Sequence, residues 1–357
     1  MCLSEDASLY GVPSVAISAL RVIICANDKT NAYRRIMKLI ARFVAAVCLI
    51  FGAGALLAQG TGKPVHLIVA FPAGGPTDFV ARVLANELSK EIGQTVIVEN
   101  KPGANGNIGA DYVTKAPPDG SVLFLTTVGA VAISPALYET LPYDPLKDFA
   151  PISLVVNNST IFVVNPRNPA SNAAQFVANS LKAPAPVPIG SSGVGSIPHL
   201  TLELFAASSK ANVTHIPYKG AAPVINDVIG NHVDGFFGDL PGLIGQIRAG
   251  QLKPLGVAAP KRHPLLPDVK TLAEQGIAGV ESNNWYALLA PAKMPKENVM
   301  MLNAAVRKAL QSDDVRRKLV ESGAEPAPST PEQVSALIQG DGAKWAQVIH
   351  EKRIKAE

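Results

Sequence analysis

Two glycine-rich segments contain the residues best suited to binding a ligand. The first, residues 71–78 (FPAGGPTD), follows an apolar run of strand length and precedes a helical pattern. Its glycines let the main chain approach a ligand closely, and Pro76 suits the first turn of a helix. Because free amides at a helix start attract anions, this segment predicts a backbone anion site. Asp78 is expected to brace it by accepting from the N-cap amide, and the alternative is an ordinary strand-to-helix turn.

The second segment, residues 190–199 (GSSGVGSIPH), repeats this design with hydroxyl groups added. A strand again leads through glycines to a helix start, where Ser196 is the expected N-cap. Two such loops in separate units suggest one anionic ligand held between them, although each alone is also compatible with a flexible strand end. The glycine spacing matches neither a Walker A loop nor a G-x-G-x-x-G fingerprint. Ser192 lacks the glycine two positions later that a serine-hydrolase elbow requires.

Alternating strands and helices are expected to position these loops. In the first half, strands are predicted at 65–71, 95–99 and 122–126, and helices around 80–88 and 108–116. In the second half, strands are predicted at 161–164, 213–216, 233–237 and 255–258, and helices at 173–181, around 200–205 and at 223–229. Such alternation is typical of parallel α/β sheets with helices on both faces. Beyond Trp285 the pattern predicts helix to the end, with Thr330 as an N-cap followed by Pro331.

The composition limits the class of protein. The 357 residues are 48% hydrophobic and 17% charged, which suits about two globular domains and argues against a disordered or fibrous chain. The formal net charge is only +4 and the basic residues are scattered, so we expect no nucleic-acid partner. All three cysteines lie before residue 59, so the body of the chain can hold no disulfide, thiolate metal site or cysteine nucleophile.

The N-terminal region has the pattern of an export signal. Residues 37–42 (MKLIAR) form a basic start, and residues 43–58 are an uncharged apolar run followed by polar positions. We interpret residues 37–58 as a signal peptide cleaved near Ala58, with residues 53–55 as a second possible site. The alternative is a membrane anchor, but the run is short and no stop-transfer charges follow it. Residues 1–36 are interpreted as an extension upstream of the true start at Met37.

A series of longer motifs resembles a known receptor family. In order along the chain they resemble the Bug-type solute receptors, also called the TctC family, of tripartite tricarboxylate transporters. The resemblance covers about residues 63–357. It is carried by residues 71–78, 99–110 (ENKPGANGNIGA), 118–120 (PDG), 141–145 (LPYDP), 148–152 (DFAPI), 193–200, 217–223 (PYKGAAP), 272–276 (LAEQG) and 285–286 (WY).

This resemblance implies a type II periplasmic-binding-protein fold. Two doubly wound α/β lobes, joined by crossing strands, would close over a small carboxylate: residues 63–160 with 284–357 form lobe 1, and residues 161–283 form lobe 2. In this family main-chain groups of both lobes hold the carboxylate. Carried onto this chain, the binding residues are Ala73, Gly74, Gly75 and Thr77 in the first loop, Ser192, Gly193, Gly195 and Ser196 in the second, and Thr126 and Thr127 beside them. The chain departs from many relatives at Val131 and Ser134.

Several other side chains are candidates with weaker signals. Asp239 ends a strand and suits either an interaction with a ligand ammonium or hydroxyl or the capping of a turn. Lys219 is interpreted as a solvated loop lysine, and His199 as a packing residue. The aromatic residues 236–237 and 285–286 suit an apolar wall, with Trp285 in the core. The six histidines show no metal-ligand spacing.

Together these observations predict an exported, monomeric binding receptor without catalytic residues, metal or cofactor. It would capture a small carboxylate by lobe closure and deliver it to the membrane subunits of a tripartite tricarboxylate-type transporter. A ligand sensor for a signalling membrane protein is the first alternative, because it differs only in its partner. An extracytoplasmic hydrolase or isomerase is the second, and it would require a base and a nucleophile that converge in the cleft.

Overall fold

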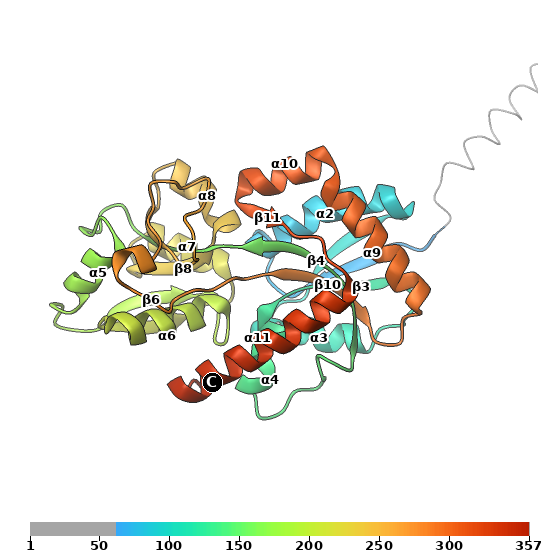
Figure 1. The fold of residues 1–357 in the computed structure, drawn as a ribbon, viewed down its shortest axis with the longest axis horizontal. Coiled ribbons are helices and arrows are strands. Elements are labelled where there is room, and N and C mark those ends of the chain that lie inside the picture. Colours follow the sequence, from blue (N-terminus) through green and yellow to red (C-terminus); the bar gives the residue numbers. More distant parts are fainter. Residues whose placement is uncertain (1–61, 357) are drawn as a thin grey trace, which may run out of the picture. The chain divides into compact units, whose positions relative to one another are not determined.

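The computed structural model describes residues 62–356, which form two β-sheets with helices packed against them (Figure 1). The first sheet has six strands in the order β11-β4-β10-β3-β1-β2. Within it β2, β1 and β3 are parallel, as the alternation of strands and helices predicts. The strands are Val65–Val69 (β1), Val96–Asn100 (β2), Val122–Thr127 (β3), Phe149–Asn158 (β4), Tyr286–Pro291 (β10) and Ala324–Pro326 (β11).

The second sheet has five strands in the order β7-β6-β8-β5-β9. Here β7, β6 and β8 are parallel, and each predicted strand of this half has a counterpart within two residues of its expected start. The strands are Thr160–Val164 (β5), Val187–Ser191 (β6), Val213–Pro217 (β7), Gly235–Asp239 (β8) and Lys253–Val257 (β9).

The chain passes between the two sheets twice, in adjacent segments. β4 ends at Asn158 and β5 begins at Thr160, so a single residue, Ser159, makes the first crossing. The second crossing precedes β10, where Asn283 forms an isolated antiparallel bridge with Ser159. The side-chain amide of Asn158 also donates to the Asn284 carbonyl at 2.8 Å. These paired segments, which run side by side in Figure 1, are the crossing strands that the resemblance implies.

Two expectations about the sheets are wrong. The sheets are mixed rather than wholly parallel, because β10 is antiparallel to β3 and β4, and β5 is antiparallel to β8 and β9. The expectation of helix from Trp285 onward is also wrong at β10 and β11. The sequence of β10 (YALLAP) is apolar and buried at all six positions, and such a run has no period that separates a strand from a buried helix.

Each face of the first sheet packs against its own group of helices. Leu67 and Val69 of β1 belong to one core, with α2, α9 and α10, while Ile68 belongs to the opposite core, with α3 and α11. Burial on both faces explains why β1 is apolar at nearly every position. The helices are α2 (Pro76–Ile92), α3 (Asn107–Thr114), α4 (Ser134–Leu137), α9 (Lys296–Gln311), α10 (Asp313–Ser322) and α11 (Pro331–Lys352), with short turns at Ala104–Gly106 (η1) and Gly129–Ile133 (η2).

The second sheet is likewise buried on both faces, each of which belongs to a different core. Phe162 and Phe237 stack with ring centroids 4.5 Å apart on one face, and Ile161 and Phe236 lie in the core of the other face. Neighbouring residues of one strand therefore serve different cores. The helices are α5 (Ala173–Ser180), α6 (Ile197–Ser209), α7 (Ala221–Ile229) and α8 (Leu240–Arg248), with a short turn at Ala273–Gln275 (η3).

Both predicted helix caps are confirmed. The Ser196 side chain accepts from the His199 amide at the start of α6. Thr330 accepts from the Gln333 amide at the start of α11, in a capping box with Pro331 in the first turn. These caps fix where each helix begins, because they satisfy amides that have no partner inside the helix.

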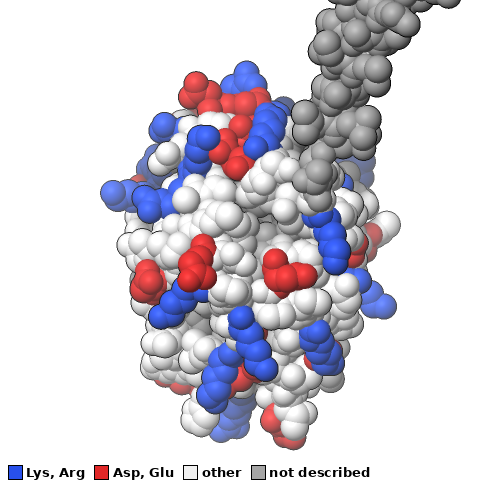
Figure 2. Space-filling view, turned by 90° about the vertical axis from the view of Figure 1, so that its right-hand side faces the viewer, with Lys and Arg blue, Asp and Glu red and all other residues white. Residues whose placement is uncertain are grey.

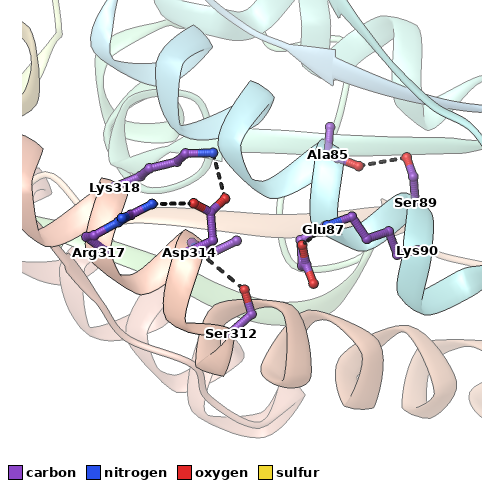
Figure 3. Close-up of polar contacts among 9 residues, drawn as sticks. Ala85, Glu87, Ser89, Lys90, Ser312, Asp314, Arg317 and Lys318 are labelled. Atoms are coloured by element: carbon purple, nitrogen blue, oxygen red, sulfur yellow. Dashed lines mark hydrogen bonds and ion pairs between the residues drawn. The ribbon is translucent and has the colours of Figure 1, made fainter.

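Figure 3 shows a similar helix start on the outer face of the first sheet's helices. Ser312 caps α10, and the Asp314 carboxylate accepts from Arg317 at 2.7 Å and from Lys318 at 2.6 Å. Nearby on α2, Lys90 donates to Glu87. Exposed ion pairs of this kind contribute about 0–1 kcal/mol each, so they shape the surface more than they stabilise the fold.

Basic and acidic side chains are interspersed on the face that Figure 2 presents, with broad uncharged areas between them. Within residues 62–356, no helix has both the length and the apolar character that a bilayer crossing requires. The interpretation of residues 1–36 as an upstream extension and of 37–58 as a signal peptide concerns positions outside the described residues.

Candidate functional site

A small cavity of about 30 Å³ lies where loops from both sheets meet. One side consists of the loop between β1 and α2, the η1 turn and the end of β3. The other side consists of the loop between β6 and α6, the start of α7 and the end of β8, with one residue from the second crossing. The lining residues are Phe71, Pro72, Gly75, Pro76, Thr77, Asn105, Thr127, Ser192, Ser196, Ile197, Pro198, Ala221, Ala222, Phe236, Asp239 and Asn284.

Half of the residues predicted for the site line this cavity. They come from both glycine-rich loops and from the ends of two strands: Gly75, Thr77, Thr127, Ser192, Ser196 and Asp239. The other half do not line the cavity: Ala73, Gly74, Asp78, Thr126, Gly193 and Gly195. The two loops therefore converge on one space, as their common design suggests.

Four helices begin at the cavity. Gly75 is the N-cap of α2, Ser196 of α6 and Asp239 of α8, while Ala221 and Ala222 open α7. Amides at helix starts carry a partial positive charge that favours an anion. The cavity thus gathers the positive ends of helices from both sheets, although no Lys, Arg or His is found among its described lining residues.

Asp78 organises the first loop from behind. Its Oδ2 accepts from the Gly74 amide at 3.0 Å and from Arg82 Nε at 2.9 Å, and its Oδ1 accepts from Asn100 Nδ2 at 3.0 Å. Burial alone would raise the pKa of Asp78, but these hydrogen bonds outweigh it and lower the pKa. The brace reaches Gly74 rather than the N-cap Gly75, so the predicted partner is wrong by one residue.

The second loop is closed by its own side chains. Ser196 Oγ donates to the Gly193 carbonyl at 2.7 Å, and the Gly195 amide donates to His199 Nδ1 at 3.1 Å. Gly193 and Gly195 have φ values of 133° and 75°, which residues other than glycine rarely adopt. These glycines therefore create the turn that exposes Ser192 and Ser196 to the cavity.

The two sides of the cavity contact each other directly. Asn105 Nδ2, from η1, donates to the Gly195 carbonyl of the second loop at 2.7 Å. A Cβ atom at Gly220 would lie 3.0 Å from the ring of Pro72, so these loops are already in close contact there. The structure is thus a closed arrangement around the cavity.

Asp239 forms the acidic part of the cavity wall. Its Oδ2 accepts from Tyr286 Oη at 2.6 Å and from Asn284 Nδ2 at 2.8 Å. Burial raises the pKa of Asp239 to about 7, and these two hydrogen bonds only partly oppose that rise. Asp239 is therefore poised to change charge near neutral pH.

Several other candidates lie outside the cavity lining. Lys219 is exposed, as expected of a solvated loop lysine. Trp285 is a core residue, as expected, and its Nε1 donates to Asp341. His199 is buried and stacks on His215 with centroids 3.8 Å apart, which agrees with a packing role. Val131 in η2 and Ser134 at the start of α4, which the resemblance singles out as departures, are both buried.

Several lining residues were not predicted for the site. Asn105 lies within the 99–110 motif but in a left-handed turn, with φ of 53°, which no local pattern specifies. Asn284 reaches the cavity only because the two crossings are paired. Ala221 and Ala222 follow a third strand-to-helix glycine, Gly220, and that repeated signal could have identified them. Phe236, a candidate for an apolar wall, does line the cavity, and the unpredicted lining residues are Phe71, Pro72, Pro76, Asn105, Ile197, Pro198, Ala221, Ala222 and Asn284.

Comparisons with known proteins agree with this architecture. The family described as "Tripartite tricarboxylate transporter family receptor" (TctC) matches residues 80–354. The periplasmic binding protein BugD is 33% identical, with a TM-score of 0.79 over 82% of this chain and 99% of BugD. A Rhodopseudomonas palustris protein, Rpa4515 with adipate, is 34% identical, with a TM-score of 0.80 over 83% of this chain and 99% of that protein. MatC from R. palustris, with bound malate, is 31% identical, with a TM-score of 0.77 over 81% of this chain and 99% of MatC.

These matches confirm the predicted periplasmic-binding-protein fold and the family resemblance, since each solved structure is covered almost completely. The family match also spans most of the chain and includes residues from both sheets. The chain therefore belongs to the TctC family of solute-binding receptors.

Proposed function

We propose that this protein captures a small carboxylate in the cavity between its two sheets and delivers it to the membrane subunits of a tripartite tricarboxylate-type transporter in the periplasm. The main support for this proposal is that two similar glycine-rich loops, which follow strands of different sheets, line a single cavity at the starts of four helices. In this proposal residues 63–160 and 284–357 act as one lobe and 161–283 as the other. The adipate and malate of the two R. palustris proteins support the choice of ligand class.

Main-chain amides supply the anion-binding groups in this proposal. The amides at the starts of α2 and α6 accompany the hydroxyl groups of Thr77 and Ser192, while the Ser196 hydroxyl already donates to the Gly193 carbonyl. A carboxylate has two oxygens that accept several hydrogen bonds, so it can bind donors of both lobes at once. Aligned helix dipoles then favour its negative charge without a lysine or arginine partner.

Lobe closure follows from such bridging. A ligand shifts an equilibrium only through contacts that differ between the two states. A carboxylate held by both loops makes its full set of contacts only in the closed state, in which Asn105 also meets Gly195. The closed shape would then be the form that membrane subunits recognise; a signalling membrane protein as recipient remains the alternative partner.

The hydrolase alternative has one contact in its favour, between Ser191 Oγ and His215 Nε2 at 2.6 Å. Neither residue lines the cavity, and burial together with the neighbouring His199 lowers the pKa of His215 to about 4. We therefore assign this pair to the support of the second loop. Product formation from esters or hydroxy acids by wild-type protein, abolished by Ser191→Ala, would instead favour the enzyme.

A thermal-shift panel tests the proposed function. Adipate, malate, citrate, aromatic acids and acidic amino acids are screened, and at least one is expected to raise the melting temperature with the logarithm of its concentration. Gly75→Val should remove that shift. A Cβ at Gly75 meets only the Pro72 carbonyl, at an ordinary 3.5 Å, so the new side chain starts without a clash, and its methyl groups are expected to block the amides.

Gly340→Val is the matched control, because Gly340 lies exposed in α11 with nothing within 4 Å of an added Cβ. It should retain the ligand-induced shift. A panel without any shift in the wild-type protein would contradict the proposed function, and equal shifts in both variants would place the ligand elsewhere.

A further inference from the structure

Three residues that line the cavity carry buried oxygen atoms that can accept hydrogen bonds but have no donor. Among the described residues, nothing donates to Oδ1 of Asn105, Asp239 or Asn284, and all three residues line the cavity. Asp239 and Asn284 retain only 6% and 7% of their exposure, so bulk water does not solvate them freely. A buried acceptor without a donor costs about 1–3 kcal/mol. The cavity is therefore built to receive donors as well as an anion.

Existing hydrogen bonds fix which end of each side chain is free. Asn284 Nδ2 donates to Asp239 Oδ2, and Asn105 Nδ2 donates to the Gly195 carbonyl. Reversing the Asn284 amide would place its oxygen against Asp239 Oδ2. Reversing the Asn105 amide would place its oxygen against the Gly195 carbonyl. In both cases two acceptors would face each other. The oxygens of both amides are consequently the atoms left for an occupant of the cavity.

When it is ionised, Asp239 adds charge to this set of acceptors. Its Oδ2 is fully engaged by Tyr286 and Asn284, which leaves Oδ1 as the carboxylate oxygen without a donor. Since no described group donates to these oxygens, their donors have to come from the ligand or from water that the ligand orders.

On the basis of the proposed function, we propose that this receptor selects carboxylates that carry a hydroxyl or ammonium donor, and that Asp239 and Asn284 accept from that donor while the helix starts hold the carboxylate. A plain carboxylic acid of the same chain length would leave these acceptors buried and unpaired. A site built to hydrogen-bond a ligand's OH or NH rejects the analogue that lacks it far more strongly than an apolar pocket rejects a missing methylene.

Isothermal titration of the wild-type protein with matched acids tests the proposal. The series are propionate, lactate and alanine; succinate, malate and aspartate; and glutarate, 2-hydroxyglutarate and glutamate. Within the best-binding series, the hydroxy or amino acid should bind at least about tenfold more tightly than the plain acid. The hydroxyl and ammonium members show which donor the site prefers.

Asp239→Asn probes the acceptor directly. If its carboxamide oxygen keeps the hydrogen bonds from Tyr286 and Asn284, its NH₂ group replaces Oδ1 at the cavity and turns an acceptor into a donor. The preference for the substituted acid should then shrink below about threefold or reverse. Asn284→Ala provides a second test should Asp239→Asn fold poorly, and it should reduce the same preference.

Asn157→Ala is the control, because Asn157 is an amide of the crossing region that contacts Asn283 and does not line the cavity. It should keep the wild-type preference. Equal affinities for plain and substituted acids in the wild-type protein would overturn this inference while leaving the proposed function intact. Failure of all acids to bind would instead contradict the proposed function itself.

Discussion

Tyr286 Oη donates a 2.6 Å hydrogen bond to Asp239 Oδ2, and this bond joins β10 of the first sheet to the end of β8 in the second. Both side chains are buried, Tyr286 completely. The bond therefore does two things: it holds the sheets together beside the cavity, and it fixes which carboxylate oxygen of Asp239 remains available to a ligand.

Tyr286→Phe should destabilise the protein by about 1.5–3 kcal/mol, the usual range for a hydrogen bond to a charged group. The phenyl ring preserves the packing, so the change isolates the hydroxyl. Urea denaturation at pH 8, where Asp239 is mostly ionised, measures the free energy of unfolding. An unchanged midpoint would show that this bond does not hold the sheets together.

Asp239 should give the stability a characteristic pH dependence. Its pKa is raised to about 7 in the folded state, so between about pH 4 and pH 7 the folded protein binds more protons than the unfolded chain. Stability from this group therefore falls as the pH rises through that window, by about 4 kcal/mol at most. The pKa of His215 is lowered to about 4 in the folded state, so the stability that His215 contributes rises with pH instead. The difference between wild type and Asp239→Asn, measured by urea denaturation from pH 4.5 to 8, isolates the aspartate; parallel curves would contradict the assignment.

Asn105→Gly should weaken the closed state. Glycine tolerates the left-handed conformation of residue 105, and it removes the amide that donates to the Gly195 carbonyl. Loss of one such bond, about 1 kcal/mol, should weaken ligand binding about fivefold. The change should appear mainly as faster ligand dissociation in stopped-flow fluorescence. A slower association rate with unchanged dissociation would argue against a role in holding the lobes closed.

Gly195→Ala tests the fit between the two sides of the cavity. An added Cβ would lie 2.2 Å from Leu137 Cδ2 and 3.3 Å from Asn105 Nδ2, in a backbone conformation with φ of 75°. Gly120→Ala carries the same kind of backbone strain, at φ of 89°, but has nothing within 4 Å of its Cβ. Affinity for the tightest carboxylate should therefore fall at least about tenfold more in Gly195→Ala than in Gly120→Ala. Similar losses in both variants would mean that only strain matters.

Much of this fold could be predicted because its signals are local. The helix start at Ser196 and the capping box at Thr330 are properties of four consecutive residues, and both are present as expected. The apolar positions Val80, Leu84 and Leu88 repeat at helical spacing and are all fully buried. The direction and identity of β10 could not be predicted in this way, because an apolar run carries no period and its pairing with β3 and β4 depends on residues over a hundred positions away.

The site residues also divide into those that local sequence predicts and those that depend on distant contacts. Gly75, Thr77, Ser192 and Ser196 follow from the sequence because a strand, a glycine turn and a helix start are adjacent in the chain. Asn284 does not, since only the paired crossings bring it to Asp239. The acceptor character of the cavity wall was therefore visible only once the two sheets were in place.

The most direct test of the central claim is a crystal structure with the carboxylate that gives the largest thermal shift. The proposed function predicts that one carboxylate group lies between the two loops, with oxygen atoms about 3 Å from amides at the starts of both α2 and α6. A ligand bound only in the separate groove beside the crossing strands, where Lys261, Arg262 and Lys344 are found, would contradict it.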